Sequence, residues 1–395
     1  MTSLFDDSLR KIQFLFKYSG MHLELKSSKT IADIIRYRWL YIINFLWLNT
    51  DVIGEIFWII DGAANGKKLS ELTYIAPCTT LCMLANLKSI FLILSEDALT
   101  QLTKNLREME RSEDGSENMV KDTIIEEQRS FLNVVISALN FWNAMTVIAF
   151  SLTPLVLMAV EFRKTNEVEL MLPFLIVYPF DSYDIKYWPF VYLHQVWSSC
   201  IVVLEIGGAD CLFYTCCTVI RTQFRLLQHD FEGIISTNES EFQEKFLKLV
   251  VRHQELMRSV NLLEKMYTKS TLFNFVSSSF LICLTGFNVT AIDDVAFVLS
   301  FLTFLLMSLL QIFLLCFFGD MIMTSSLEVS IAIYNSRWYL AKATTAKQLF
   351  LVQIRAQKPC KLTASSYADV NLRAFMRILS TAWSYFALLK TIEKD

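Results

Sequence analysis

The sequence has little charge and few glycines for its length. Asp, Glu, Lys and Arg make up 19% of its 395 residues, whereas about 25% is usual in soluble proteins. Its 10 glycines are scattered singly apart from Gly207-Gly208, so neither a phosphate-binding loop nor a dinucleotide-binding motif is present. The Gly-x-Ser-x-Gly and His-Glu-x-x-His motifs are also missing. We therefore predict that the protein is not an enzyme and uses no cofactor.

The sequence also argues against nucleic-acid binding, a metal site and a disulfide framework. The net charge of -3 provides no overall basic field for nucleic acid. The four histidines show no i, i+4 pair that would hold a metal ion. Eight of the nine cysteines lie in apolar stretches, and none lies in a segment that we place outside the cell. Residues 1–30 are too charged to form a cleavable signal peptide.

What the sequence does contain is long apolar runs. Four runs without a charged residue reach the ~18–20 residues that cross a bilayer, and they are 130–160, 187–204, 270–292 and 295–319. Three weaker runs, 39–60, 72–95 and 368–390, are interrupted by a few charges. We therefore predict an all-α membrane protein with seven transmembrane helices.

The distribution of Lys and Arg predicts how this bundle is oriented. The N-terminal segment and every second loop hold 26 of the 36 basic residues, and the alternate loops with the C-terminus hold 7. Basic residues favour the cytoplasmic side, so we expect a cytoplasmic N-terminus and an extracellular C-terminus. Asn288 begins an Asn-Val-Thr sequon at the outer end of the fifth span, which makes it a glycosylation candidate.

The spans divide the chain into four parts. We expect a cytoplasmic N-terminal segment (1–38), six transmembrane helices (39–345), a cytoplasmic anchor helix (346–366) and the seventh helix (367–395). Within 39–345, the segments 96–130 and 220–270 are predicted to extend helices into the cytoplasm. An apolar stripe at helical spacing in 246–266 supports the second extension.

Short motifs across the chain resemble those of the insect odorant receptor family. They are Ile333–Tyr339 (IYNSRWY), Gln357-Lys358-Pro359, Ser384–Lys390 (SYFALLK), Leu172-Pro173-Phe174, Tyr178–Asp181 (YPFD), Gln195 and Gly208-x-Asp210-x-Leu212-Phe213. The ending Ser384-Tyr385 followed by Thr391-Ile392 departs from the Thr-Tyr, Gln-Phe signature of gustatory receptors. The segment 220–270 is shorter than the corresponding loop of the odorant co-receptor. The resemblance therefore indicates a ligand-tuned odorant receptor subunit.

The resemblance implies an odorant-gated, non-selective cation channel, formed as a heterotetramer with the co-receptor. Its implied partners are a small volatile odorant, co-receptor subunits, the lipid bilayer and permeating cations, in the plasma membrane of a sensory dendrite. The alternatives are a seven-helix G-protein-coupled or gustatory-type chemoreceptor and a membrane transporter. The Asp-Arg-Tyr and Asn-Pro-x-x-Tyr motifs of rhodopsin-type receptors are missing.

By family analogy, the ligand site lies between helices two to six in the outer half of the membrane. The candidate ligand-binding residues there are Tyr74, Cys78, Thr146, Phe150, Thr153, Tyr192, Gln195, Ser199 and Phe287. The family also implies that the last helix lines the pore, with Ser384, Leu388 and Thr391 as pore or gate residues. Ordinary helix packing is the alternative for each of these positions.

Five charged residues fall inside or at the ends of the predicted spans, where burial costs on the order of 3 kcal/mol. They are Asp51, Glu55, Lys88, Glu205 and Asp210. We expect them to be paired or interfacial, with Lys88 reaching the cytoplasmic interface and Asp210 where the fourth helix leaves the bilayer. His194 is expected to be a hydrogen-bonded polar residue at the outer interface and not a metal ligand.

Overall fold

The protein is a bundle of long helices. The computed structural model describes residues 3–22, 31–67, 69–113, 119–167, 169–235, 239–291 and 295–392. Its elements are α1 (Leu4–Ser19), α2 (Ile31–Ala64), α3 (Leu69–Leu94), α4 (Glu96–Glu113), α5 (Met119–Thr165), α6 (Trp188–Glu232), α7 (Glu239–Ala291), α8 (Val295–Asn335), the 3-10 turn η1 (Trp338–Leu340), α9 (Ala343–Ala356), β1 (Thr363–Ala364), β2 (Ala368–Asp369) and α10 (Leu372–Ile392). The prediction of an all-α membrane protein is confirmed.

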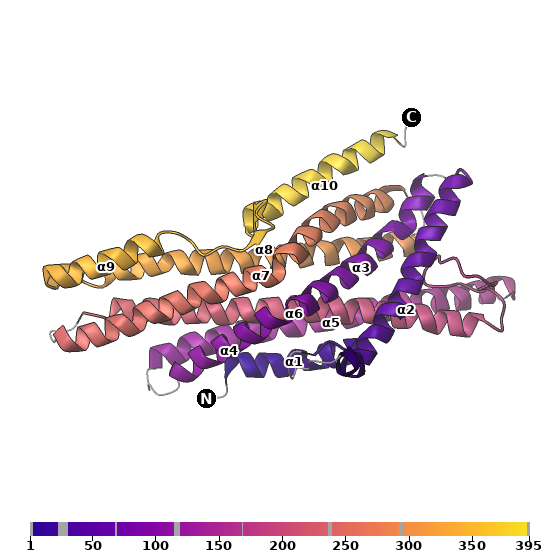
Figure 1. Cartoon of the computed structure of the whole chain (residues 1–395). Helices are drawn as coiled ribbons and strands as arrows, with labels where there is room; N and C mark the ends of the chain where they lie inside the picture. The colour runs from indigo at the N-terminus through magenta and orange to yellow at the C-terminus, as the bar shows by residue number, and fades with distance from the viewer. Residues whose placement is uncertain are drawn as a thin grey trace.

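Four helices, α5 to α8, are much longer than a bilayer is thick. They contain 41 to 53 residues, or roughly 60–80 Å at about 1.5 Å per residue, whereas the hydrocarbon core measures about 30 Å. Figure 1 shows them side by side, with one end of the bundle extended beyond α2 and α10. In the predicted extensions 96–130 and 220–270, the described residues lie mostly in the helices α4, α5, α6 and α7, while 114–118 and 236–238 lie outside the described residues.

Among the described residues, six helices are long and apolar enough to cross a membrane. They are α2, α3, α5, α6, α7 and α8. The expected seventh span, α10, has 21 residues and carries Arg373, Arg377 and Lys390. Its length of roughly 31 Å suits one crossing, but α10 is not one of those six helices. The helix begins at Leu372, later than the predicted 367.

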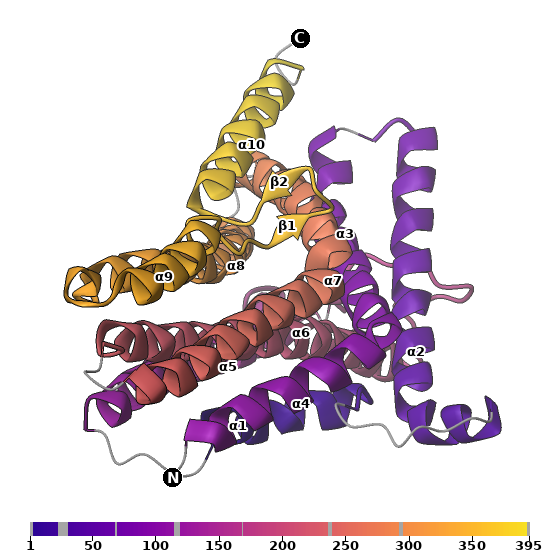
Figure 2. The ribbon, with the colours of Figure 1, turned by 60° about the vertical axis from the view of Figure 1, so that its left-hand side comes forward.

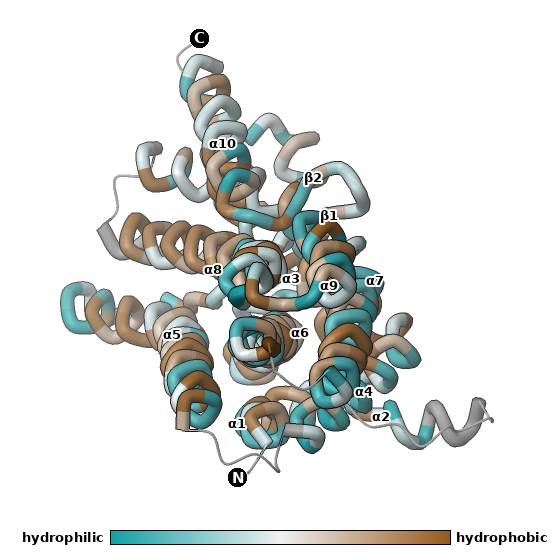
Figure 3. Tube along the Cα trace, turned by 90° about the vertical axis from the view of Figure 1, so that its left-hand side faces the viewer, coloured by the Kyte–Doolittle hydropathy of each residue, from teal (hydrophilic) through white to brown (hydrophobic). Residues whose placement is uncertain are grey.

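The helix α6 forms the centre of the bundle. Every residue from Gly207 to Ile220 is buried, as expected of a helix that is surrounded on all sides. It packs against α1, α3, α5 and α8, and the end-on view in Figure 3 shows it inside a ring of helices. The same view shows polar turns at the near end of the bundle and apolar turns further along α5 and α8.

The N-terminal helix α1 packs mainly against α6. Its buried residues Phe5, Ile12 and Phe16 lie on the side that packs against α6. Glu110 of α4 accepts a hydrogen bond from the Phe5 backbone N–H at 3.2 Å, at a helix N-terminus where negative charge is favoured. Burial raises the pKa of Glu110 in spite of the hydrogen bonds from Ser3 and Phe5.

The predicted anchor segment, 346–366, contains most of the helix α9 and the first strand of a small hairpin. The helix α9 packs against α8, and the antiparallel pair β1–β2 packs against α7. Thr363 donates a hydrogen bond to Glu264 of α7 at 2.6 Å, and the Ser365 N–H donates to Thr268 at 2.8 Å. Figure 2 shows the hairpin between α7 and α10. Strands of two residues have no detectable period, so the sequence did not predict them.

The glycosylation prediction for Asn288 is wrong for this fold. Its side chain is fully buried on α7. The amide donates to the Thr73 carbonyl at 2.9 Å and accepts from the Thr73 hydroxyl at 2.8 Å. A glycan needs an exposed Asn amide, whereas this one joins α7 to α3.

Candidate functional site

A cavity lies between α2, α3, α5, α6 and α8. Its empty volume is about 1140 Å³, part of which belongs to its open mouth. Many of the lining side chains are apolar, and they include Leu81, Leu139, Val147, Phe150, Phe174, Val202, Val203, Ile206, Phe304, Met307 and Leu310. Such a cavity suits a small apolar ligand.

Three aromatic rings from different parts of the chain form one wall. Phe150 of α5 lies 4.4 Å from Phe304 of α8 and 6.2 Å from Phe174, measured between ring centroids. Phe174 belongs to the α5–α6 loop (166–187). Tilted and offset rings at such distances attract one another beyond simple burial. A ligand between these rings contacts both helices and the loop.

Gln195 of α6 fixes the loop at the point where Phe174 meets the cavity. The Phe174 N–H donates to Gln195 Oε1 at 2.9 Å. Gln195 Nε2 donates to the Phe174 carbonyl at 3.1 Å and to the Tyr178 hydroxyl at 3.4 Å. Because Gln195 is fully buried, breaking these bonds would leave unpaired polar groups. The loop is therefore held in a defined position.

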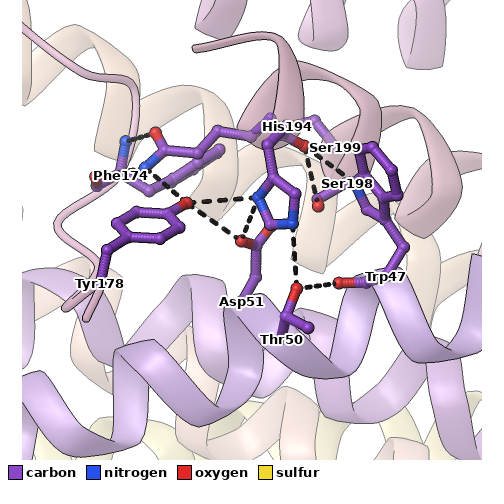
Figure 4. Close-up of polar contacts among 9 residues, drawn as sticks. Trp47, Thr50, Asp51, Phe174, Tyr178, His194, Ser198 and Ser199 are labelled. Atoms are coloured by element: carbon purple, nitrogen blue, oxygen red, sulfur yellow. Dashed lines mark hydrogen bonds and ion pairs between the residues drawn. The ribbon is translucent and has the colours of Figure 1, made fainter. Parts of the chain in front are cut away.

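A second polar group joins this loop to α2. His194 Nδ1 lies 2.9 Å from Asp51 Oδ1, and the Tyr178 hydroxyl lies within 3.4 Å of both side chains. His194 Nε2 contacts the Thr50 hydroxyl at 2.9 Å, and its ring stacks on Trp47. Figure 4 shows Asp51 between Tyr178 and His194. The structure thus confirms His194 as a hydrogen-bonded polar residue.

A buried ion pair lies at the opposite end of the cavity. Lys88 Nζ of α3 is 2.6 Å from Asp210 Oδ1 of α6, and Gln311 Nε2 of α8 donates to Asp210 Oδ2 at 2.9 Å. The expectation that these charges are paired is confirmed for both, whereas the expected reach of Lys88 to the cytoplasmic interface is corrected. Lys88 is only 3% exposed and does not reach an interface. Asp210 lies inside α6, which continues for 22 residues to Glu232.

Comparison with known proteins decides the family. The family model described as "7tm Odorant receptor" matches residues 69–383, which is most of the chain. The chain belongs to the 7tm odorant receptor family. It is 25% identical to odorant receptor 67c of Drosophila melanogaster over 93% of this chain and 91% of the relative. It is also 25% identical to the putative odorant receptor 92a of that species, over 98% and 95%.

Solved structures show the same fold. The insect olfactory receptor OR5 of Machilis hrabei in complex with eugenol superposes with a TM-score of 0.81, over 98% of each chain at 16% identity. The structure of OR5 described without a ligand gives a TM-score of 0.79. The protein is therefore an odorant receptor and a multi-pass membrane protein, and not an enzyme. In the described part of the chain, no three His, Cys, Asp or Glu residues form a metal site.

Four of the predicted ligand-binding residues line the cavity of the receptor. They are Cys78, Thr146, Phe150 and Ser199. The i, i+4 spacing of Thr146 and Phe150 brings both to the same wall. Tyr74 lies on α3, but its side chain is outside the described residues. Contact between a ligand and these four residues remains a prediction.

The other four predicted residues do not line this cavity, so their contact with a ligand stays a prediction that the cavity does not support. Gln195 is occupied by the Phe174 backbone. The Tyr192 hydroxyl donates to the Ser151 carbonyl, and the Thr153 hydroxyl donates to the Ala149 carbonyl of its own helix at 2.8 Å. Phe287 is buried near the end of α7, away from this cavity.

Several lining residues were missed from the sequence. Phe304, Met307 and Gln311 lie in or beside the charge-free run 295–319, where almost every position is apolar. No period marks the face of α8 that meets the cavity, so their position was not predictable. Asn143 lies on α5 one turn before Thr146 and shares its wall, and i, i+3 spacing was the available signal.

The predicted pore residues all lie on an exposed part of α10. Ser384, Leu388 and Thr391 are spaced i, i+4 and i+7, so they share one face of the helix. Each is exposed in the single chain, and Leu388 is 55% exposed. The buried residues Ala374, Ile378 and Ala382 lie on the side toward α7 and α8.

The aromatic wall predicts the effect of one truncation. Replacing Phe150 with Ala removes a ring that meets Phe174 and Phe304, and loss of a buried ring costs ~3–5 kcal/mol in a packed core. We expect part of this loss to appear in ligand affinity, so that the half-maximal concentration of the best agonist rises about tenfold or more. The measurement is an agonist dose–response in cells that express the receptor.

Phe141→Ala is the matched control because Phe141 lies on the same helix and is 68% exposed. This variant should keep the wild-type dose–response. Unchanged responses of Phe150→Ala to several odorants would remove Phe150 from the ligand site. Reduced surface expression of Phe150→Ala would instead identify a folding defect.

Proposed function

We propose that the receptor is the odorant-binding subunit of an odorant-gated, non-selective cation channel. In this proposal it forms a heterotetramer with the odorant co-receptor in the plasma membrane of a sensory neuron dendrite. Four similar subunits place their last helices around a central pore. The observation that carries the proposal is the uncovered second half of α10.

In this part of α10, hydroxyl groups are interspersed among exposed aromatic and apolar side chains, whereas a single helix surrounded by lipid requires only apolar side chains. Trp383, Tyr385 and Leu388 are more than half exposed, while Ser384 and Thr391 supply hydroxyl groups between them. Figure 1 shows the helix leaving the bundle toward the C-terminus. Small and polar groups along an apolar helix allow close packing of helices or contact with water. A neighbouring subunit and a pore supply both environments.

The Ser384, Leu388 and Thr391 face is suited to form a gate. A ring that contains Leu388 can close a narrow pore by excluding water, without a charged plug. Thr391 lies about one turn further along and places a hydroxyl beside the permeating ion. In a mixed tetramer this chain contributes only part of the ring, so substitutions have partial effects.

The cavity supports a small volatile molecule as the ligand. Its apolar walls provide affinity through burial, at about 25 cal/mol per Å². Cys78, Thr146, Phe150 and Ser199 are the predicted contacts that lie there. The structural relative OR5 was solved with eugenol, a small aromatic molecule. That relative supports a small molecule as the class of ligand. The side chains of this cavity determine which small molecule binds.

The length of the α6–α7 connection supports a tuned subunit and not the co-receptor. α6 ends at Glu232 and α7 begins at Glu239, so few residues separate the two helices. The co-receptor is expected to carry a larger insertion here. The cytoplasmic N-terminus and extracellular C-terminus rest on the excess of basic residues in alternate loops.

The gate assignment predicts a gain of function. Leu388→Ser replaces an apolar ring member with a hydroxyl, which lowers the cost of wetting a narrow pore. We expect it to raise the basal current without agonist in cells that also express the co-receptor. Thr391→Glu and Thr391→Lys should shift the reversal potential in opposite directions, because they add opposite charges beside the ion.

Met376→Ser is a control on the same helix, since Met376 is also exposed but lies about three turns before Leu388, in the first half of α10. It should leave the basal current unchanged. Normal surface expression with wild-type basal current and reversal potential in both Leu388 and Thr391 variants would contradict a pore-lining α10. Odorant-evoked current from this chain alone would contradict the heteromer.

The charge distribution predicts the accessibility of the two termini. An epitope at the C-terminus should be stained on intact cells, and one at the N-terminus only after permeabilisation. The measurement is antibody staining before and after detergent treatment, with a cytosolic protein as the control for membrane integrity. The opposite pattern would contradict the proposed orientation and favour a G-protein-coupled type of topology.

A further inference from the structure

We propose that the cavity selects ligands that carry a hydrogen-bond donor, and that the Glu55 carboxyl group accepts this hydrogen bond. The ligand class is a small apolar molecule with one hydroxyl or amine group. This inference rests on the proposal that the cavity is the odorant site. It concerns which molecules bind there, and not how the channel opens.

Glu55 is an acidic side chain without a complete set of partners. It lies on α2, lines the cavity and is only 2% exposed. Its Oε2 atom is covered and accepts no hydrogen bond from the described residues. Buried carboxyl oxygens are normally hydrogen-bonded because they lose water on burial. A donor that arrives with a ligand would supply the missing bond.

The two other acids that line the cavity are already occupied. Asp51 is held by His194 and Tyr178, and Asp210 is held by Lys88 and Gln311. Neither needs a ligand to satisfy it. Among the described residues, Glu55 makes no ion pair, so no protein cation competes with a ligand for its carboxyl group.

The side chains around Glu55 are weak or engaged hydrogen-bond donors, which leaves its carboxyl group able to accept a hydrogen bond from a ligand. Cys78 and Cys82 of α3 line the cavity and lie close to Glu55, and thiols are weak donors. The Thr79 hydroxyl is shared between the carboxyl group and the Ile75 carbonyl, to which it donates at 3.3 Å, so it does not satisfy both Glu55 oxygens. The last torsion of a Glu side chain is broad, so rotation can turn either oxygen toward a ligand.

A site of this kind discriminates strongly against molecules without the donor. If an ether occupies the cavity, the buried carboxyl oxygen stays without a hydrogen bond. The resulting loss of affinity is larger than the difference that apolar contacts alone produce between similar ligands. An alcohol and its ether isomer have the same atoms, so apolar burial hardly distinguishes them. We expect at least tenfold tighter binding of the alcohol.

The test uses isomer pairs that differ only in the donor. The probes are hexan-1-ol against 1-methoxypentane and benzyl alcohol against anisole, with hexan-1-amine and benzylamine as charged donors. Binding is measured by thermal stabilisation of the purified receptor in detergent, and currents are recorded in parallel with the co-receptor. Binding without current would contradict the channel proposal alone. The preference of the receptor for ligands with a hydrogen-bond donor could still be measured from binding alone.

Three variants assign the preference to Glu55. Glu55→Leu should abolish the alcohol-over-ether preference, and Glu55→Gln should weaken it, because the Gln amide accepts from an alcohol but also donates to an ether oxygen. Retention of amine binding in Glu55→Gln would show that the donor, and not its charge, is recognised. Glu205→Gln is the matched control, since both Glu205 carboxyl oxygens are also buried without a partner but do not line the cavity. It should change nothing.

The inference is overturned if the wild-type receptor binds both members of each pair equally, or binds none of the donors while responding to other volatiles. It is also overturned if Glu55→Leu weakens alcohol and ether to the same degree, because Glu55 would then only support the cavity wall. A preference that Glu205→Gln removes as well would assign the effect to folding. These results concern ligand choice and leave the gate predictions for α10 untouched.

Discussion

The buried ion pair between Lys88 and Asp210 constrains the whole bundle. Charges at membrane depth are costly, and a partner must therefore lie within hydrogen-bond distance when the protein is folded. Asp210 satisfies this by meeting Lys88 of α3 on one oxygen and Gln311 of α8 on the other. Three helices that are distant in sequence are thereby held at one point. That point is the polar end of the cavity.

At the other end, polar contacts fix the α5–α6 loop. Gln195 binds both backbone groups of Phe174, and His194 joins Asp51 to Tyr178. The cavity is therefore apolar in its walls and polar at its two ends. A ligand that separates Phe150 from Phe174 or Phe304 shifts groups that are tied to α6 and α8.

The sequence predicted the helices well and the side-chain partners poorly. Apolar runs were sufficient for six of the predicted spans, and the apolar stripe in 246–266 was sufficient for the helical extension before the fifth span. The partners of Lys88, Asp210 and Asn288 depend on which helices meet, and residues more than a hundred positions apart supply them. Helix periodicity brought Thr146 and Phe150 to the cavity wall. It could not show that Gln195 binds a loop or that the uniformly apolar α8 contributes Phe304.

A double-mutant cycle on Lys88 and Asp210 tests most directly whether the ion pair holds the cavity. Lys88→Met or Asp210→Asn alone leaves one buried charge unpaired, which costs about 3–5 kcal/mol. Each should lower the melting temperature of the purified receptor and its stabilisation by odorant. The double variant carries no charge at this point and should regain most of both. Single variants that melt and bind like the wild type, or a double variant that loses the sum of the two effects, would contradict this account.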